Sequence, residues 1–137
     1  SWASGLPPAL FEQAVIAPTA RIVAAVRAEV PGAKIIGFPR AATQTGYVAY
    51  VRASGVDALS LDTAAPMDWA AKTLNCALQG NLDPIALVAG GAALDRAVDN
   101  ILAATQGKPF IFNLGHGILP QTPIAHVEQL LKRVRGC

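Results

Sequence analysis

Hydrophobic and polar residues along the chain follow two alternating periods. Apolar residues three or four positions apart predict helices, at residues 7–30, 45–54, 66–74, 83–88, 93–105 and 123–134. Between them, short apolar runs predict strands, at residues 33–38, 57–61, 76–79 and 109–113. Pro18 predicts a break or kink near Ala17, because proline lacks the amide that a helix uses. Short apolar strands separated by helices indicate a parallel sheet covered by helices.

Each long predicted helix has one apolar side, which we expect to face the sheet. In the first helix this side holds Leu10, Ala14, Ile22, Val23 and Val26. In the helix at residues 93–105 it holds Leu94, Val98, Ile101 and Leu102, and in the last helix it holds Ile124, Val127, Leu130 and Leu131.

The loops that follow the predicted strands contain polar residues or glycine. They begin at Phe38-Pro39-Arg40, Asp62-Thr63, Gly80-Asn81 and Leu114-Gly115-His116. Two architectures fit, a doubly wound open sheet and part of a (β/α)8 barrel, and barrel enzymes hold their sites at the carboxyl ends of strands. No GxGxxG loop follows a strand, which disfavours a nucleotide-binding sheet. Because a whole barrel takes about 250 residues, the 137 residues predict one half-barrel fragment, residues 1–137, of a TIM barrel.

The composition is unusually apolar for a small domain. Hydrophobic residues make up 53% of the chain and charged residues 15%, and the mean hydropathy is +0.39. Disordered chains are poor in apolar residues, so disorder is excluded. A half-barrel explains the excess, because it exposes inner faces that the other half would cover.

The charge and the cysteine content limit which binding partners and which cellular setting the chain can have. The net charge is +2, and basic residues gather only at residues 132–135, where cations suit the end of a helix. This pattern disfavours nucleic acid, and no run reaches the roughly 18 charge-free apolar residues of a membrane span. Cys76 and Cys137 form no pattern and indicate a reduced, cytoplasmic setting. Cys76 has no neighbouring ligand, and His116 and His126 lie on different elements, so we expect no metal.

The strand-end loops supply the candidate functional residues. His116 stands between two glycines, where it either binds a ligand group or makes a structural hydrogen bond. Asp62 is either a site acid or a helix cap near Thr63. Arg40 could bind an anion, but spacing alone favours a solvated side chain.

The remaining polar and aromatic residues have structural interpretations. Asn81 or Asp83 is expected to cap the next helix from a turn. His126 lies on the polar side of the last helix and is expected to face solvent. Trp2 and Trp69 are expected to be packing residues.

Two long motifs are specific enough to compare with known families. Residues 112–120, Phe-Asn-Leu-Gly-His-Gly-Ile-Leu-Pro, followed by Thr122 and Pro123, resemble the closing motif of the uroporphyrinogen decarboxylase family. Residues 78–84, Leu-Gln-Gly-Asn-Leu-Asp-Pro, resemble that family's other carboxyl-terminal motif. Residues 1–6 resemble its loop after a mid-barrel strand, although Ser4 replaces the usual glycine. The resemblance extends over the whole chain.

The resemblance implies a cofactor-free (β/α)8 carboxy-lyase of porphyrin and haem biosynthesis, usually a cytoplasmic homodimer. Such an enzyme converts uroporphyrinogen III to coproporphyrinogen III by removing four acetate carboxyl groups as CO2. His116 and Ser1 match substrate-binding residues of the family. The family's site aspartate, arginines and tyrosine belong to an amino-terminal half outside this sequence. We therefore expect this chain to contain no catalytic residue, no metal site and no cofactor site. By itself the fragment should be inactive.

Two alternatives stay open. One is a cobalamin-dependent methyltransferase of the same fold, although the chain lacks the HxC zinc pair of those relatives. The other is a non-catalytic half-barrel that serves as a binding or assembly module, which a gene beginning near Ser1 would favour.

Overall fold

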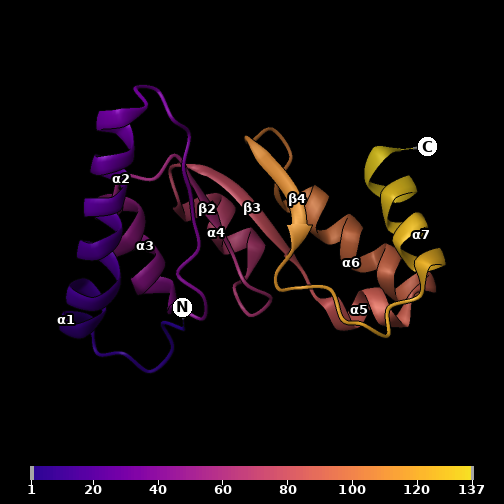
Figure 1. Ribbon diagram of the computed structural model, residues 1–137. Coiled ribbons are helices and arrows are strands. Elements are labelled where there is room, and N and C mark those ends of the chain that lie inside the picture. The colour runs from indigo at the N-terminus through magenta and orange to yellow at the C-terminus, as the bar shows by residue number, and fades with distance from the viewer. Residues whose placement is uncertain (1, 137) are drawn as a thin grey trace.

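The strands form one parallel sheet in the computed structural model, which describes residues 2–136. The sheet has four strands in the order β1-β2-β3-β4, the order of the chain. Their bounds are Ile36–Gly37 for β1, Ala58–Ser60 for β2, Ala77–Leu82 for β3 and Phe110–Leu114 for β4. The predicted parallel sheet alternating with helices is thereby confirmed. Successive units follow one another across the molecule from one side to the other (Figure 1).

The helices match the predicted segments, with shifted ends. They are α1 at Pro8–Phe11, η1 at Glu12–Ile16, α2 at Ala17–Glu29, α3 at Gln44–Ser54, α4 at Met67–Thr73, α5 at Pro84–Ala89, α6 at Gly91–Ala104 and α7 at Ile124–Arg135. The predicted break takes the form of a π-helical turn, η1, inside one continuous helix. Pro18 cannot donate to the carbonyl four residues earlier, and the wider turn before it absorbs that mismatch.

Local sequence sets several helix ends. The Thr43 hydroxyl accepts a hydrogen bond from the Gly46 amide at 3.1 Å and begins α3, which ends at Gly55 with a left-handed φ of 78°. Asp83 caps α5 by accepting from the Ile85 amide at 2.8 Å, as predicted. These caps fix the points at which the chain leaves and enters each helix.

The core lies between the sheet and the helices that cover one of its faces. Leu59 of β2 and Leu78 of β3 pair across the sheet and are fully buried. On α6, Leu94, Val98 and Ile101 are buried, as the helical period predicted. Burial of this row anchors the two central strands.

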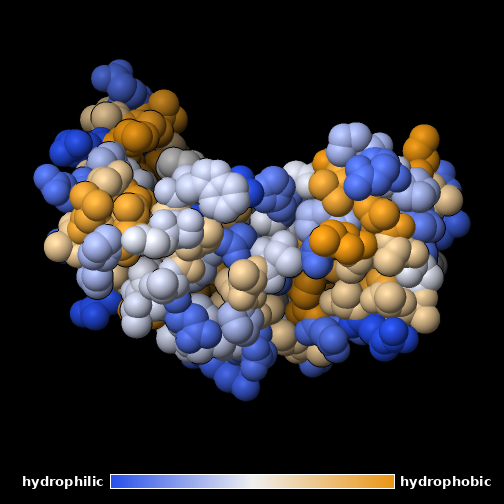
Figure 2. Space-filling view, turned by 90° about the horizontal axis from the view of Figure 1, so that it is seen from below, coloured by the Kyte–Doolittle hydropathy of each residue, from blue (hydrophilic) through white to orange (hydrophobic). Residues whose placement is uncertain are grey.

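The opposite face of the sheet is covered only in part, with Ser60 buried and Gln79 half-buried. Ser60, Gln79 and Ile111 form one row across β2, β3 and β4. The Ile111 side chain is 47% exposed, and Ile36 and Phe38, at the β1 edge, are exposed as well. Seen from below, the molecule is an open crescent with hydrophobic side chains on both arms (Figure 2). The exposed inner face accounts for part of the high apolar content.

The predicted inner side of the first helix is partly wrong. Leu10, Ile22 and Val26 are exposed, Ile22 by 62%, whereas Phe11, Ile16 and Val23 are buried. The π-helical turn causes this shift, because it places residues five apart, Phe11 and Ile16, on the same side of the helix. On α7, Leu130 is buried as predicted, but Ile124 and Leu131 are exposed.

The continuous helix Pro8–Glu29 is long and apolar enough to cross a membrane by length and composition alone. Only 17% of its most apolar window is buried. It packs against α3, whereas an outer helix of a whole barrel has a neighbour on each side. Its exposure therefore fits an outer helix of a partial barrel.

Candidate functional site

The carboxyl ends of the strands form a rim that includes the first described residues. Trp2 and Arg40 form a parallel β-bridge, and the Ala3 amide donates to the Arg40 carbonyl at 2.8 Å. The segment at residue 2 therefore runs beside the end of β1, as a neighbouring barrel strand would. Ser1 lies outside the described residues, so its contact with substrate stays a prediction.

Asp62 is a buried structural residue at the end of β2. Its carboxylate accepts hydrogen bonds from the Ala41 amide, the Tyr47 hydroxyl at 3.1 Å and the Ala64 amide at 3.0 Å. Burial, and next the charge of Asp62, raise the pKa of Tyr47 well above its ordinary value. The phenol therefore keeps its proton and donates to Asp62. Of the two interpretations of Asp62, these bonds favour the one that caps the turn after β2.

Asn81 also ties strand ends together, and the prediction that it lies in a turn is wrong. Strand β3 continues through Leu82, and Asn81 is buried within it. Its side-chain amide donates to the carbonyls of Asp62 at 2.9 Å and Ala65 at 2.6 Å. The side chain thus donates hydrogen bonds to two carbonyls of the loop after β2. These bonds offset the cost of burying a polar asparagine here.

His116 is presented by two glycines with different roles. The Gly115 amide donates to the Leu82 carbonyl at 2.8 Å, and a Cβ on Gly115 would lie 2.4 Å from the Thr63 backbone nitrogen. Only glycine fits this contact. The amide of Gly117 donates to Nδ1 of His116 at 2.7 Å. Because Nδ1 is an acceptor, a neutral imidazole carries its proton on Nε2, which can donate to an anion.

A small hollow joins these strand ends. Its volume is about 210 Å³, and Trp2, Arg40, Asp62, Thr63 and His116 line it with Ala41, Ala64 and Gly115. The Arg40 guanidinium lies 3.5 Å above the centre of the Trp2 ring. The predictions of a solvated Arg40 and a packing Trp2 are therefore wrong, since Trp2 is 65% exposed and stacks with the half-buried arginine. Arg40 follows a strand, and the family resemblance places residues 1–6 after another strand. Together these two positions were the signal that could have predicted the contact.

His126 is not part of this rim, and the prediction that it faces solvent is wrong. The ring is half-buried, and Nδ1 donates to the carbonyls of Leu87 and Val88, both at 3.1 Å. Helix carbonyls at a carboxyl end lack partners within the helix, and His126 supplies one from α7. A Cβ on Gly90 would lie 2.4 Å from the ring, so a glycine allows this close contact.

Other reactive residues stand apart from the hollow. Burial raises the pKa of the Cys76 thiol, which disfavours the nucleophilic thiolate. Trp69 packs against the core, as predicted. Among residues 2–136, no group of three or more His, Cys, Asp or Glu side chains is placed to hold a metal ion.

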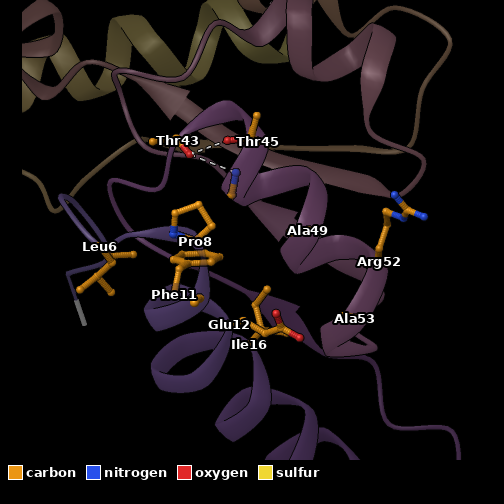
Figure 3. A pocket seen from close by; sticks show the side chains of 13 residues that line it. Leu6, Pro8, Phe11, Glu12, Ile16, Thr43, Thr45, Ala49, Arg52 and Ala53 are labelled. Carbon is orange, nitrogen blue, oxygen red and sulfur yellow. Dashed lines mark hydrogen bonds between the residues drawn. The ribbon is translucent and has the colours of Figure 1, made fainter.

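A larger cavity, about 560 Å³, lies elsewhere, between the first helix and α3 (Figure 3). Its walls are mainly apolar, with Phe11 and Ile16 on one side and Ala49 on the other. The Thr43 hydroxyl at its rim is already used to cap α3. Neither Arg40, Asp62 nor His116 lines this cavity, so the chemistry points to the smaller hollow.

The fold and its polar rim are those of part of a (β/α)8 barrel. The chain belongs to the uroporphyrinogen decarboxylase family, whose pattern it matches over residues 1–137. It is 57% identical over 138 aligned residues to the uroporphyrinogen decarboxylase of Sphingopyxis alaskensis, with 99% of this chain and 40% of that protein covered. The corresponding protein of Rhizorhabdus wittichii is 55% identical, with 99% and 40% covered. That of Maricaulis maris is also 55% identical, with 98% and 39% covered. The chain thus spans about 40% of the length of these relatives.

Proposed function

We propose that this chain is the carboxyl-terminal part of a uroporphyrinogen decarboxylase, which converts uroporphyrinogen III to coproporphyrinogen III. The observation that carries the proposal is His116, which stands in the family's closing motif and lines a hollow at the strand ends. The reaction removes four acetate carboxyl groups as CO2 and leaves methyl groups. The complete enzyme is this chain together with the rest of the length that its relatives have.

The reaction needs a proton donor and a rigid hold on the substrate. Protonation of a pyrrole ring carbon makes a cationic ring that can accept electrons. The bond between the acetate methylene and its carboxylate then breaks, CO2 leaves, and the electron pair enters the ring system. A proton adds to the methylene to give a methyl group, and the ring proton is lost. Each round consumes one proton and uses no oxidant.

His116 is suited to hold a carboxylate that stays on the substrate. The departing carboxylate loses its negative charge in the transition state. A donor bound to that group would stabilise the substrate more than the transition state and slow the reaction. A neutral imidazole with its proton on Nε2 therefore serves best as a donor to a different carboxylate, fixing the macrocycle in place.

The chain alone supplies only part of the site. Ligand pockets usually measure roughly 300–1,000 Å³, and the hollow measures about 210 Å³. It can hold one carboxylate arm of a tetrapyrrole but not the macrocycle. The remainder of the relatives' length would supply the other wall and the proton donor, so the isolated chain should be inactive. A cytoplasmic homodimer is the setting that the family resemblance implies.

The test is turnover of uroporphyrinogen by the complete enzyme and by His116 variants. Loss of one charge-assisted hydrogen bond costs about 1.5–3 kcal/mol, so His116→Ala should lower kcat/KM by about ten- to a hundredfold, mainly through KM. His116→Gln keeps an N–H donor and should recover part of the loss. A complete enzyme that releases no CO2 would contradict the proposed function, and unchanged kinetics for His116→Ala would contradict the role of the histidine.

A further inference from the structure

Beside His116, Arg40 lines the hollow, and its guanidinium makes no side-chain hydrogen bond among residues 2–136. Arg40 is half-buried and stacks 3.5 Å from the centre of the Trp2 ring. Among residues 2–136, no carboxylate forms an ion pair with it. A half-buried cation without a charged partner, at the edge of a hollow, is suited to bind an anion from outside the chain.

Stacking on the Trp2 ring does not use the N–H groups of the arginine. The face of the guanidinium lies on the indole, while its N–H groups point outward in the plane of the group. Two of these groups can bind both oxygens of one carboxylate. The indole is held by the main chain, because the Trp2–Arg40 bridge and the bond from the Ala3 amide to the Arg40 carbonyl fix both segments.

The nearest carboxylate in the hollow does not compete for Arg40. Asp62 is buried and already accepts hydrogen bonds from Ala41, Tyr47 and Ala64. His116 lines the same hollow, and because its Nδ1 accepts from the Gly117 amide, Nε2 is the ring nitrogen left to donate to a ligand. Two lining side chains, Arg40 and His116, can therefore donate to an anion, while Asp62 is committed to the fold.

We propose that Arg40, positioned by Trp2, binds a propionate carboxylate of the tetrapyrrole. This inference rests on the proposed function and extends it to a specific contact. Uroporphyrinogen has one acetate and one propionate on each pyrrole, and the reaction removes only acetate carboxylates. An arginine that binds propionate has such a group available in every round, because the reaction removes no propionate. An arginine that bound acetate would lose its ligand as the reaction proceeds.

The test compares ligand binding and turnover in the complete enzyme. The probe is coproporphyrinogen III, kept reduced under anaerobic conditions, because it retains the propionates and has lost every acetate. Arg40→Gln should weaken its binding by about ten- to a hundredfold, as expected for a charge-assisted bidentate contact. The same variant should raise KM for uroporphyrinogen by a similar factor with little change in kcat. Arg40→Lys keeps the charge but not the planar fork, and should lose less.

Variants at Trp2 test the positioning role separately. Trp2→Phe keeps an aromatic platform and should bind coproporphyrinogen nearly as well as the parent protein. Trp2→Leu removes the platform and should weaken binding several-fold, again through KM rather than kcat. Arg96→Gln is the matched control, because Arg96 is exposed on α6, outside the hollow.

The two proposals fail in different ways. If the parent enzyme does not decarboxylate uroporphyrinogen, the proposed function fails, and the binding measurements still decide the role of Arg40. If Arg40→Gln binds coproporphyrinogen as tightly as the parent enzyme, or if the parent does not bind it at all, the inference is overturned. Equal losses for Arg40→Gln and Arg96→Gln would also overturn it, since they would reflect net charge alone.

Discussion

The central strands and the outer strands of the sheet differ in how completely they are covered. In β2 and β3, Leu59 and Leu78 are fully buried, with a strand on each side and helices over one face. Strand β1 has only two residues, and along β4 exposed residues such as Ile111 alternate with half-buried ones. A strand inside a closed barrel has a neighbouring strand on each side and is buried along its whole length. We therefore expect further strands of a whole barrel to pack against β1 and β4.

The sharpest test of this comparison is a pair of core substitutions. Leu78→Ala should lower the free energy of unfolding by about 2–5 kcal/mol, because the fully buried leucine leaves a cavity. Ile111→Ala, on the partly covered face, should cost at most about 0.5 kcal/mol in the chain by itself. Urea unfolding followed by circular dichroism measures both. In the complete enzyme the cost of Ile111→Ala should rise, and equal costs in the two settings would contradict an interface at β4.

The two glycines beside His116 allow a smaller test at the rim. Gly115→Ala places a Cβ against the Thr63 backbone and should cost about 1–3 kcal/mol of stability through overpacking. Gly117→Ala meets no atom within 4 Å and should change stability by at most about 0.5 kcal/mol. Thermal unfolding distinguishes them. Equal effects would mean that the close contact between the loops after β2 and β4 does not hold the histidine in place.

The smallest effect concerns the ion pair that supports β1. Asp57 accepts from the Ile35 amide at 2.9 Å and from Arg27 at 2.7 Å. The Ile35 amide first, and then Arg27 and Lys34, lower the pKa of Asp57. Because the folded-state pKa lies below the unfolded value of about 3.9, this carboxylate stabilises the fold above that pH. The stabilisation is lost as the pH falls through the folded-state pKa.

The matching variant is Asp57→Asn. It should lower Tm slightly at pH 7 and should differ little from the parent chain once the pH is below the folded-state pKa. Asp68→Asn, in an exposed pair with Lys72 at 4.0 Å, is the control and should leave Tm nearly unchanged. A Tm difference for Asp57→Asn that stayed constant into acid would assign its effect to shape rather than charge.

The sequence was sufficient to predict those features that depend on residues near one another in the chain. The strand periods, the cap at Asp83 and the buried row of α6 depend on residues that are close in the chain. It was insufficient where partners are distant. His126 binds carbonyls 38 and 39 residues away, and Arg40 meets Trp2 only because two strand ends become neighbours.

The predicted buried side of the first helix is partly wrong for a different reason. The predicted inward residues follow one helical period past Pro18 although Pro18 predicts a break, and the π-helical turn at Glu12–Ile16 shifts the buried side. The prediction that Asn81 lies in a turn is wrong because an Asn after glycine is typical of a turn. Here the strand continues, and the Asn81 side chain donates to two carbonyls of the loop after β2. Residue type alone does not distinguish these environments.

The order of the strands in the sheet also has a consequence for how the chain can fold. Because each strand pairs with the next one in the sequence, every unit contacts mainly its immediate neighbours. The paired residues are 19 to 32 positions apart in the sequence, so each pairing closes a loop of moderate length. The buried pair β2 and β3 can form first, and β1 and β4 can then add at either side. Closing the two outer strands onto the rest of a barrel is the step that joins distant parts of the sequence, and it should be the slow one.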